Sequence, residues 1–205
     1  MATHDAALQG PPAHEEHATS TGLDNTKMAM WAFLGSECLF FGSLISTYLL
    51  YRSRVGSGPT PAEIYDIPFT SVSSFVLLMS SLTMVLALSA KQRGDESGMR
   101  AWLLATAFLG MTFIGGQVYE FTTFYEEGLA LSKSPFGSAF FMATGFHGAH
   151  VTVGILMLLA LVGMSYAGRL STDGARKVEL IGLYWHFVDI VWIVIFTVVY
   201  LVPTE

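Results

Sequence analysis

The sequence predicts an all-α membrane protein, a polytopic bundle of five transmembrane helices. Apolar residues make up 52% of the 205 residues and charged residues only 13%, against about 25% charged residues in a typical soluble domain. The apolar residues form five long runs separated by short polar segments, and each run reaches the roughly 20 residues that a helix needs to cross the hydrocarbon core. Three of the runs contain ionisable residues well inside their ends. Such residues are costly in hydrocarbon and therefore indicate buried polar structure.

The five expected spans follow one another through short connections. In chain order they are residues 28–51, 69–90, 101–121, 138–166 and 178–202. The fourth is longer than the hydrocarbon core requires, so we expect it to tilt or to extend beyond the core. Residues 1–26 are polar and are expected to form a flexible cytoplasmic tail. The rest of the chain, residues 27–205, is then one transmembrane domain.

The distribution of Lys and Arg predicts the orientation of the bundle. Most basic residues lie in the tail and near the second and fourth connections: Lys27, Lys91, Arg93, Arg100, Arg169, Arg176 and Lys177. Only Arg52, Arg54 and Lys133 lie at the other end, beside several acidic residues. Because basic residues favour the cytoplasmic side, we expect the N-terminus in the cytoplasm and the C-terminus outside.

Charge and cysteine usage exclude several classes of protein. A net charge of −6, with no basic stripe interleaved with aromatic residues, argues against a nucleic-acid partner. The single cysteine, Cys38, excludes a disulfide framework and a CxxC redox or zinc site. The chain also has no nucleotide-binding glycine loop, nucleophile elbow or HExxH pattern.

The first expected span carries an intramembrane carboxylate and a seam of small residues. Glu37 lies nine positions after Met28, which places it about 13 Å deep, near the midplane. We expect this carboxylate to be unpaired, and to carry protons, to bind a lipid head group or a carbodiimide, or to hydrogen-bond to a neighbouring helix. The small residues, which allow a neighbouring backbone to approach closely, are Gly35, Cys38, Gly42 and Ser46.

Five further ionisable residues occupy the later spans. Glu120 is expected near the outer end of its span, whereas the pairs His147/His150 and His186/Asp189 are spaced i, i+3 and should each share a helix face. One interpretation is interhelical hydrogen bonding, with the carboxylate orienting a histidine. The other is axial ligation of a metal or haem. The absence of a fourth neutral donor from another span weighs against the metal.

Four motifs extend the interpretation beyond a bundle with buried polar contacts. They are Gly35–Phe41 (GSECLFF), Gly116–Glu120 (GQVYE), Ser138–Val151 (SAFFMATGFHGAHV) and Tyr184–Trp192 (YWHFVDIVW). In order and spacing they resemble subunit III of the haem-copper oxidases, and the resemblance runs from about Met28 to Leu201. The chain is similar to the five-span bacterial form, which lacks the two N-terminal helices of the longer version.

The resemblance implies an accessory role in aerobic respiration. Subunit III carries no catalytic centre, haem or copper, since these cofactors belong to partner subunits. It docks on subunit I, beside subunit II and a small subunit IV, in the bacterial plasma membrane. There it holds phospholipids in a cleft and supports proton uptake and turnover stability. Glu37 matches the carbodiimide-reactive glutamate of the family, and its other buried polar positions are matched by Glu120, His147, His150, His186 and Asp189.

Two alternatives remain at this point. Residues 60–69 and 196–201 are similar to the quinol-oxidising branch, whereas Glu37 and residues 184–189 favour the cytochrome c branch. A rival of another class is a stand-alone transporter or proton channel that uses the intramembrane ionisable residues as a relay. Transporters usually show broken helices or paired repeats near the midplane, and the sequence shows neither.

Overall fold

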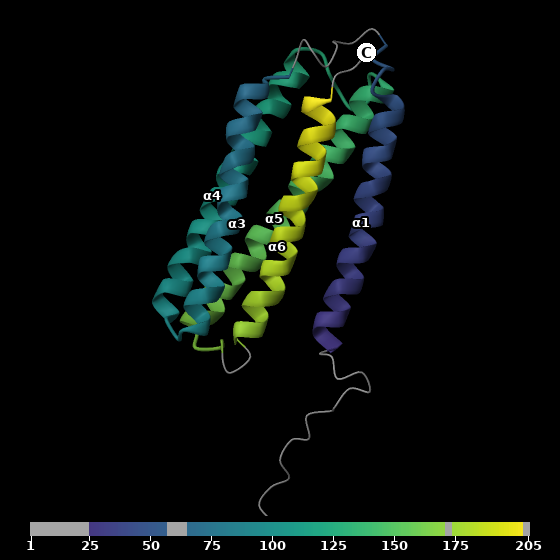
Figure 1. The fold of residues 1–205 in the computed structure, drawn as a ribbon. Coiled ribbons are helices and arrows are strands. Elements are labelled where there is room, and N and C mark those ends of the chain that lie inside the picture. Colours follow the sequence, from purple (N-terminus) through teal and green to yellow (C-terminus); the bar gives the residue numbers. More distant parts are fainter. Residues whose placement is uncertain (1–24, 57–64, 171–173, 203–205) are drawn as a thin grey trace, which may run out of the picture.

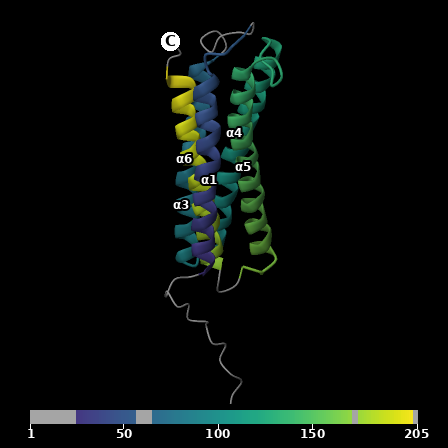
Figure 2. The same ribbon diagram turned by 90° about the vertical axis from the view of Figure 1, so that its right-hand side faces the viewer.

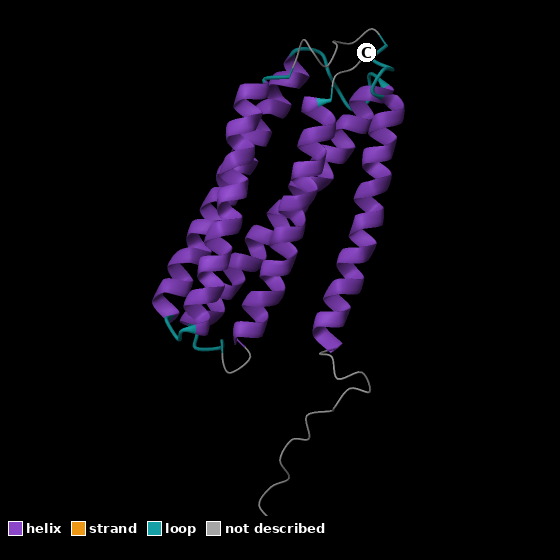
Figure 3. Cartoon of the chain, in the orientation of Figure 1, coloured by secondary structure: helices purple, strands orange, loops and turns teal. Residues whose placement is uncertain are grey.

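The computed structural model describes residues 25–56, 65–170 and 174–202, and all regular structure in these residues is helical. The α-helices are α1 (Asn25–Tyr51), α3 (Ile67–Gln92), α4 (Glu96–Glu126), α5 (Pro135–Tyr166) and α6 (Gly174–Phe196). A short π-helix, η1 (Thr197–Leu201), continues α6 (Figures 1 and 3). The predicted all-α fold is therefore confirmed. The polar tail lies outside the described residues, apart from the first two residues of α1.

Five helices are long and apolar enough to cross a membrane, α6 together with η1 counting as one. They are the five expected spans in the expected order, but each of them is longer than predicted. The largest difference is in α4, which begins at Glu96 and ends at Glu126 rather than covering only residues 101–121. Hydropathy marks the stretch inside hydrocarbon, whereas the helices continue into the polar interface until a cap ends them.

Side-chain caps fix where three of the helices begin. The capping residues, each accepting a backbone N–H three residues on, are Asp66 before α3, Asp95 before α4 and Ser134 before α5. At α4 the Asp95 carboxylate accepts the N–H of Gly98 at 2.8 Å. Gly94 precedes it with φ of 77°, a conformation that glycine adopts without strain. The connection between α3 and α4 is therefore only three residues long.

The helices form a bundle in which α1 stands partly apart from the others toward its start (Figure 1). In the view turned by 90°, α1 lies in front of α6 (Figure 2). Within the bundle α3 packs against α4 and α6, and α5 packs against α4, α6 and α1. Helix α1 contacts mainly α5, and its buried residues are Leu34, Phe41 and Tyr48. These recur every seven residues and so form a narrow stripe on one face. Near its start, Lys27 of α1 forms an ion pair with Glu179 of α6 at 2.7 Å.

The two sets of connections lie at opposite ends of the bundle. The start of α1 lies at the same end as the turn between α3 and α4, whereas η1 ends at the other end (Figure 1). Most of the basic residues, seven of the ten, are therefore gathered at one end of the molecule. Which end faces the cytoplasm stays a prediction.

A buried tryptophan joins four helices in the core. The Trp185 ring of α6 lies against Gly110 of α4 and Gly154 of α5, where an added Cβ would come within 2.7 Å and 2.8 Å of it. Its Nε1 donates to Ser80 Oγ of α3 at 2.9 Å. The volume of the ring therefore accounts for glycine at these two positions.

Candidate functional site

Glu37 is paired, so the expectation of an unpaired carboxylate is wrong. Its Oε2 lies 3.2 Å from His150 Nε2, and this contact joins α1 to α5. The side chains are 17% and 19% exposed, respectively, so the pair is shielded but reachable from the bundle surface. Sequence alone did not reveal the partner, because the two residues lie more than a hundred positions apart.

The second histidine nitrogen determines how this pair shares protons. His150 Nδ1 lies 2.7 Å from the Phe146 carbonyl oxygen. A carbonyl only accepts hydrogen bonds, so Nδ1 carries a hydrogen and donates it. A hydrogen bond between Nε2 and the Glu37 carboxyl group then needs one proton, which either group can supply. Glu37 and His150 are thus placed to share a proton.

His186 and Asp189 meet at a hydroxyl group of α3. Ser81 Oγ donates to Asp189 Oδ2 and lies 3.1 Å from His186 Nδ1. With Asp189 ionised, the hydroxyl donates to the carboxylate and accepts from the imidazole. Both residues share a face of α6, as predicted, and their joint contact supports the interpretation of interhelical hydrogen bonding. Ser81 itself was missed, since serines in apolar helices commonly bond to their own backbone.

His147 faces a different neighbour from His150. It is fully buried and stacks on Trp192 of α6 with ring centroids 4.8 Å apart, while the edge of Phe113 of α4 meets it at 5.8 Å. Neither ring nitrogen has a hydrogen-bond partner within the described part of the chain. The two histidines lie one helical turn apart on α5, as the spacing predicted, but they contact different helices: His150 contacts α1, and His147 contacts α4 and α6.

Glu120 bonds to a hydroxyl of α3 near the end of the bundle where η1 lies. Thr70 Oγ1 donates to Glu120 Oε1, and the glutamate is only 5% exposed. The rings of Tyr65 and Tyr200 lie next to this contact, tilted against each other with centroids 4.6 Å apart. Tyr65 precedes α3, and burial raises the pKa of its phenol well above the usual value.

The π-helical turn positions the aromatic residues beside Glu120. Both Val199 and Tyr200 of η1 are buried. The Tyr48 hydroxyl of α1 donates to the Val199 carbonyl oxygen at 3.3 Å and lies 3.5 Å from the Tyr65 hydroxyl. The sequence predicted a regular helix here, since no local signal distinguishes one π-turn from continued α-helix.

These contacts connect helices in pairs and do not converge on one centre. Within the described residues, no group of three His, Cys, Asp or Glu side chains is placed to hold a metal ion. Glu37 contacts His150, whereas Asp189 and Glu120 contact hydroxyls of α3. The arrangement can hold helices together and, at Glu37, share a proton.

The small-residue seam of α1 is not used inside the described part of this chain. A Cβ added at Gly35 or Gly42 would find nothing within 4 Å, and Cys38 is exposed. The close backbone approach that these residues permit is therefore available to another molecule.

Comparison of the sequence with known proteins identifies the family to which it is similar. The model of the family "Cytochrome c oxidase subunit III" matches residues 4–203. Cytochrome c oxidase subunit 3 of Bacillus sp. (strain PS3) is 39% identical over 93% of this chain and 92% of its own length. Quinol oxidase subunit 3 of Bacillus subtilis (strain 168) is 37% identical over 91% of each chain. Cytochrome bo(3) ubiquinol oxidase subunit 3 of Pseudomonas aeruginosa is 37% identical over 92% of each.

Proposed function

Because the chain belongs to the cytochrome c oxidase subunit III family, we propose that it serves as the non-redox accessory subunit of a proton-pumping haem-copper oxidase. One observation carries the accessory role. Each intramembrane carboxylate that the structure describes contacts a side chain of a neighbouring helix: Glu37 with His150, Glu120 with Thr70, and Asp189 with Ser81. Such contacts stabilise a bundle, which favours a structural role over a proton relay through this chain.

The exposed face of α1 is the proposed docking surface for subunit I. This helix has the fewest buried residues of the five spans, and Gly35 and Gly42 leave room for a close helix-to-helix approach. Subunit II and a small subunit IV complete the complex. Haem and copper are bound by these partners and not by this chain.

The proposed role is to hold phospholipid and to keep proton uptake and turnover stable. It is carried out in the bacterial plasma membrane, with the N-terminus of the chain in the cytoplasm and the C-terminus outside. The basic end of the bundle supports this orientation. The Glu37–His150 pair, which is partly exposed at the surface between α1 and α5, is the proton-sharing group nearest the docking face.

Cytochrome c is the proposed electron donor of the complex. Glu37 and residues 184–189 favour this branch, although relatives named as quinol oxidase subunits match the chain at similar identity. The donor docks on other subunits, so the choice does not alter the role of this chain.

Affinity purification of the tagged chain from native membranes tests the proposal. We expect it to elute with haem-containing partners that give a reduced-minus-oxidised spectrum, while a strain with the untagged chain yields none. Elution of the chain alone, free of haem proteins, would instead support a stand-alone transporter.

A further inference from the structure

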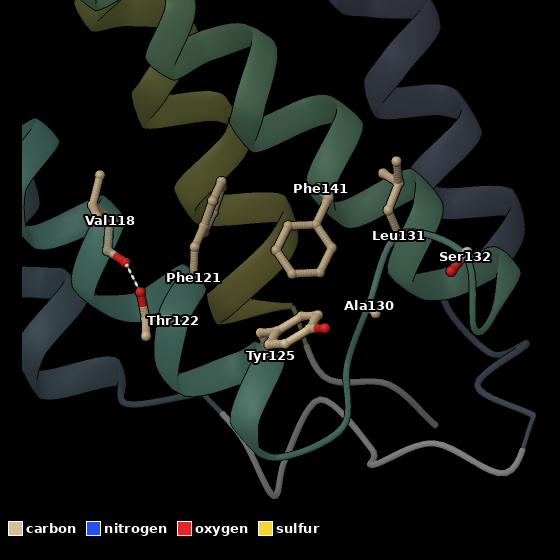
Figure 4. A pocket seen from close by; sticks show the side chains of 8 residues that line it. All are labelled: Val118, Phe121, Thr122, Tyr125, Ala130, Leu131, Ser132 and Phe141. Atoms are coloured by element: carbon tan, nitrogen blue, oxygen red, sulfur yellow. Dashed lines mark hydrogen bonds between the residues drawn. The ribbon is translucent and has the colours of Figure 1, made fainter.

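A pocket between α4 and α5 is separate from all the polar contacts described above. Its volume is about 630 Å³, within the roughly 300–1,000 Å³ of typical ligand sites. It lies beside the last turns of α4, opens to the surface and is bordered by residues 130–132 of the following connection (Figure 4). Phe121 and Phe141 form its wall, with ring centroids 5.0 Å apart, and Tyr125 and Ser132 also line it.

The surroundings of the pocket determine the kind of ligand that reaches it. The lining belongs largely to helices that are able to span the membrane, so we expect acyl chains of the surrounding lipid to reach it. Thr122 adds no free donor, because its hydroxyl bonds to the Val118 carbonyl oxygen at 2.8 Å (Figure 4). An apolar chain fits such a lining without leaving a polar group unpaired.

Charged residues of both signs adjoin, in the sequence, residues that line the pocket. Lys133 directly follows Ser132, and Glu126 and Glu127 directly follow Tyr125. All three are exposed, and none of them forms an ion pair with another residue in the part of the chain that the structure describes. A phosphate group complements the lysine, and an ammonium group complements the glutamates. A head group with only negative charge would meet two carboxylates for one cation.

We propose that this pocket binds one acyl chain of a zwitterionic phospholipid of the phosphatidylethanolamine type. The chain lies between Phe121 and Phe141, the phosphate faces Lys133, and the ammonium group faces Glu126 and Glu127. The inference deepens the lipid-holding part of the proposed function and rests on it, and it adds the site and the class of lipid.

Photolabelling of the purified complex tests the site. The complex is placed in vesicles of phosphatidylethanolamine and phosphatidylglycerol with a trace of phosphatidylethanolamine carrying a diazirine in its acyl chain. We expect mass spectrometry to find the label on residues that line the pocket. Thr122→Phe fills part of the pocket and should displace about two methylene groups of the acyl chain. The labelling should therefore fall about tenfold.

Thr112→Phe is the matched control for the filling variant. Thr112 is also exposed on α4 and also bonds to its own helix, at the Phe108 carbonyl oxygen, but it does not line the pocket. This variant should label like the unchanged protein. Equal labelling of the Thr122→Phe variant would overturn the site, because the label would then report the general lipid-facing surface.

A second probe tests the head group. With a diazirine-labelled phosphatidylglycerol, the unchanged protein should be labelled less than with phosphatidylethanolamine, and Glu126→Gln/Glu127→Gln should remove this difference. Equal labelling of the unchanged protein by both lipids would overturn the zwitterionic assignment. Failure of the proposed function would be visible separately, since the full chain would then purify without haem proteins while its pocket was still labelled.

Discussion

Asp189 shows how much a single hydroxyl matters for a carboxylate inside a membrane. Ser81 donates to Oδ2, whereas Oδ1 is buried and has no partner among the described residues. Removing a hydrogen-bond donor from a buried charge costs more than the net value of the bond, because the charge stays desolvated. Ser81 is therefore as important for this contact as the ionisable residue that the sequence pointed to.

Ser81→Ala should loosen the subunit. It leaves the Asp189 carboxyl group without its donor, at a cost of about 1–3 kcal/mol, and it disconnects His186. We expect less subunit to remain on the oxidase during detergent purification, with an unchanged haem spectrum of the remaining core. Asp189→Ala should act in the same direction, and His147→Ala more mildly, because a neutral imidazole leaves no charge behind.

Thr112→Ala is the control for this series. Thr112 is exposed on α4, away from the proposed docking face, and bonds only to its own helix, at the Phe108 carbonyl oxygen, so retention should not change. Normal retention of the Asp189→Ala variant, together with immediate loss of activity, would indicate a catalytic or proton-carrying role and contradict the structural interpretation.

Glu37 should be the residue that dicyclohexylcarbodiimide labels. Its side chain is 17% exposed, whereas Glu120 is buried against Thr70. Glu37→Gln should abolish the labelling and leave electron transfer in place, while Glu120→Gln should leave the labelling unchanged. Peptide mapping by mass spectrometry identifies the residue. Label at another site, or complete loss of oxygen reduction in Glu37→Gln, would refute this role.

At the scale of the elements, capping sets where α4 begins. Hydrogen bonds from the Gly98 N–H and the Ser97 hydroxyl hold the pKa of Asp95 below its usual range. A carboxyl whose pKa is lower in the folded state stabilises the fold above the unfolded value of about 3.9. That stabilisation is lost as the pH falls through the folded pKa.

Asp95→Ala should therefore increase hydrogen exchange in the first turn of α4 at neutral pH. The effect should shrink as the pH falls below about 3.9, because protonated Asp95 in the unchanged protein caps less well. Glu126→Gln, at the opposite end of the same helix, is the control and should leave this turn unchanged. Equal exchange of Asp95→Ala and the unchanged protein at neutral pH would show that the cap is not what fixes this end.

The elements also show what sequence can predict. The five spans were predicted because runs of about 20 predominantly apolar residues are typical of helices that cross a bilayer. The ends of α4 were not predicted, because capping residues lie in the polar interface, where hydropathy does not indicate whether a helix continues. The partners Ser81 and Thr70 were not predicted either. Hydroxyl residues are frequent in these helices, and only the packing of α3 against α4 and α6 distinguishes those two from the rest.

At the scale of the whole molecule, the concentration of basic residues at one end predicts its orientation. A periplasm-active alkaline phosphatase fused after Val202 should be active, and the same enzyme inserted after Arg93 should be inactive. Val202 follows η1, and Arg93 lies in the turn between α3 and α4. Activity in the opposite pattern would reverse the bundle and with it the proposed cytoplasmic N-terminus.

The central claim is that this chain supports an oxidase without taking part in its redox chemistry. The most direct measurement compares the purified complex with and without this subunit, following oxygen consumption from the first turnovers until activity is lost. We expect the same haem and copper content and a measurable initial rate in both preparations, but earlier inactivation without the subunit. Loss of a metal centre, or an initial rate of zero, in the complex without it would contradict the account.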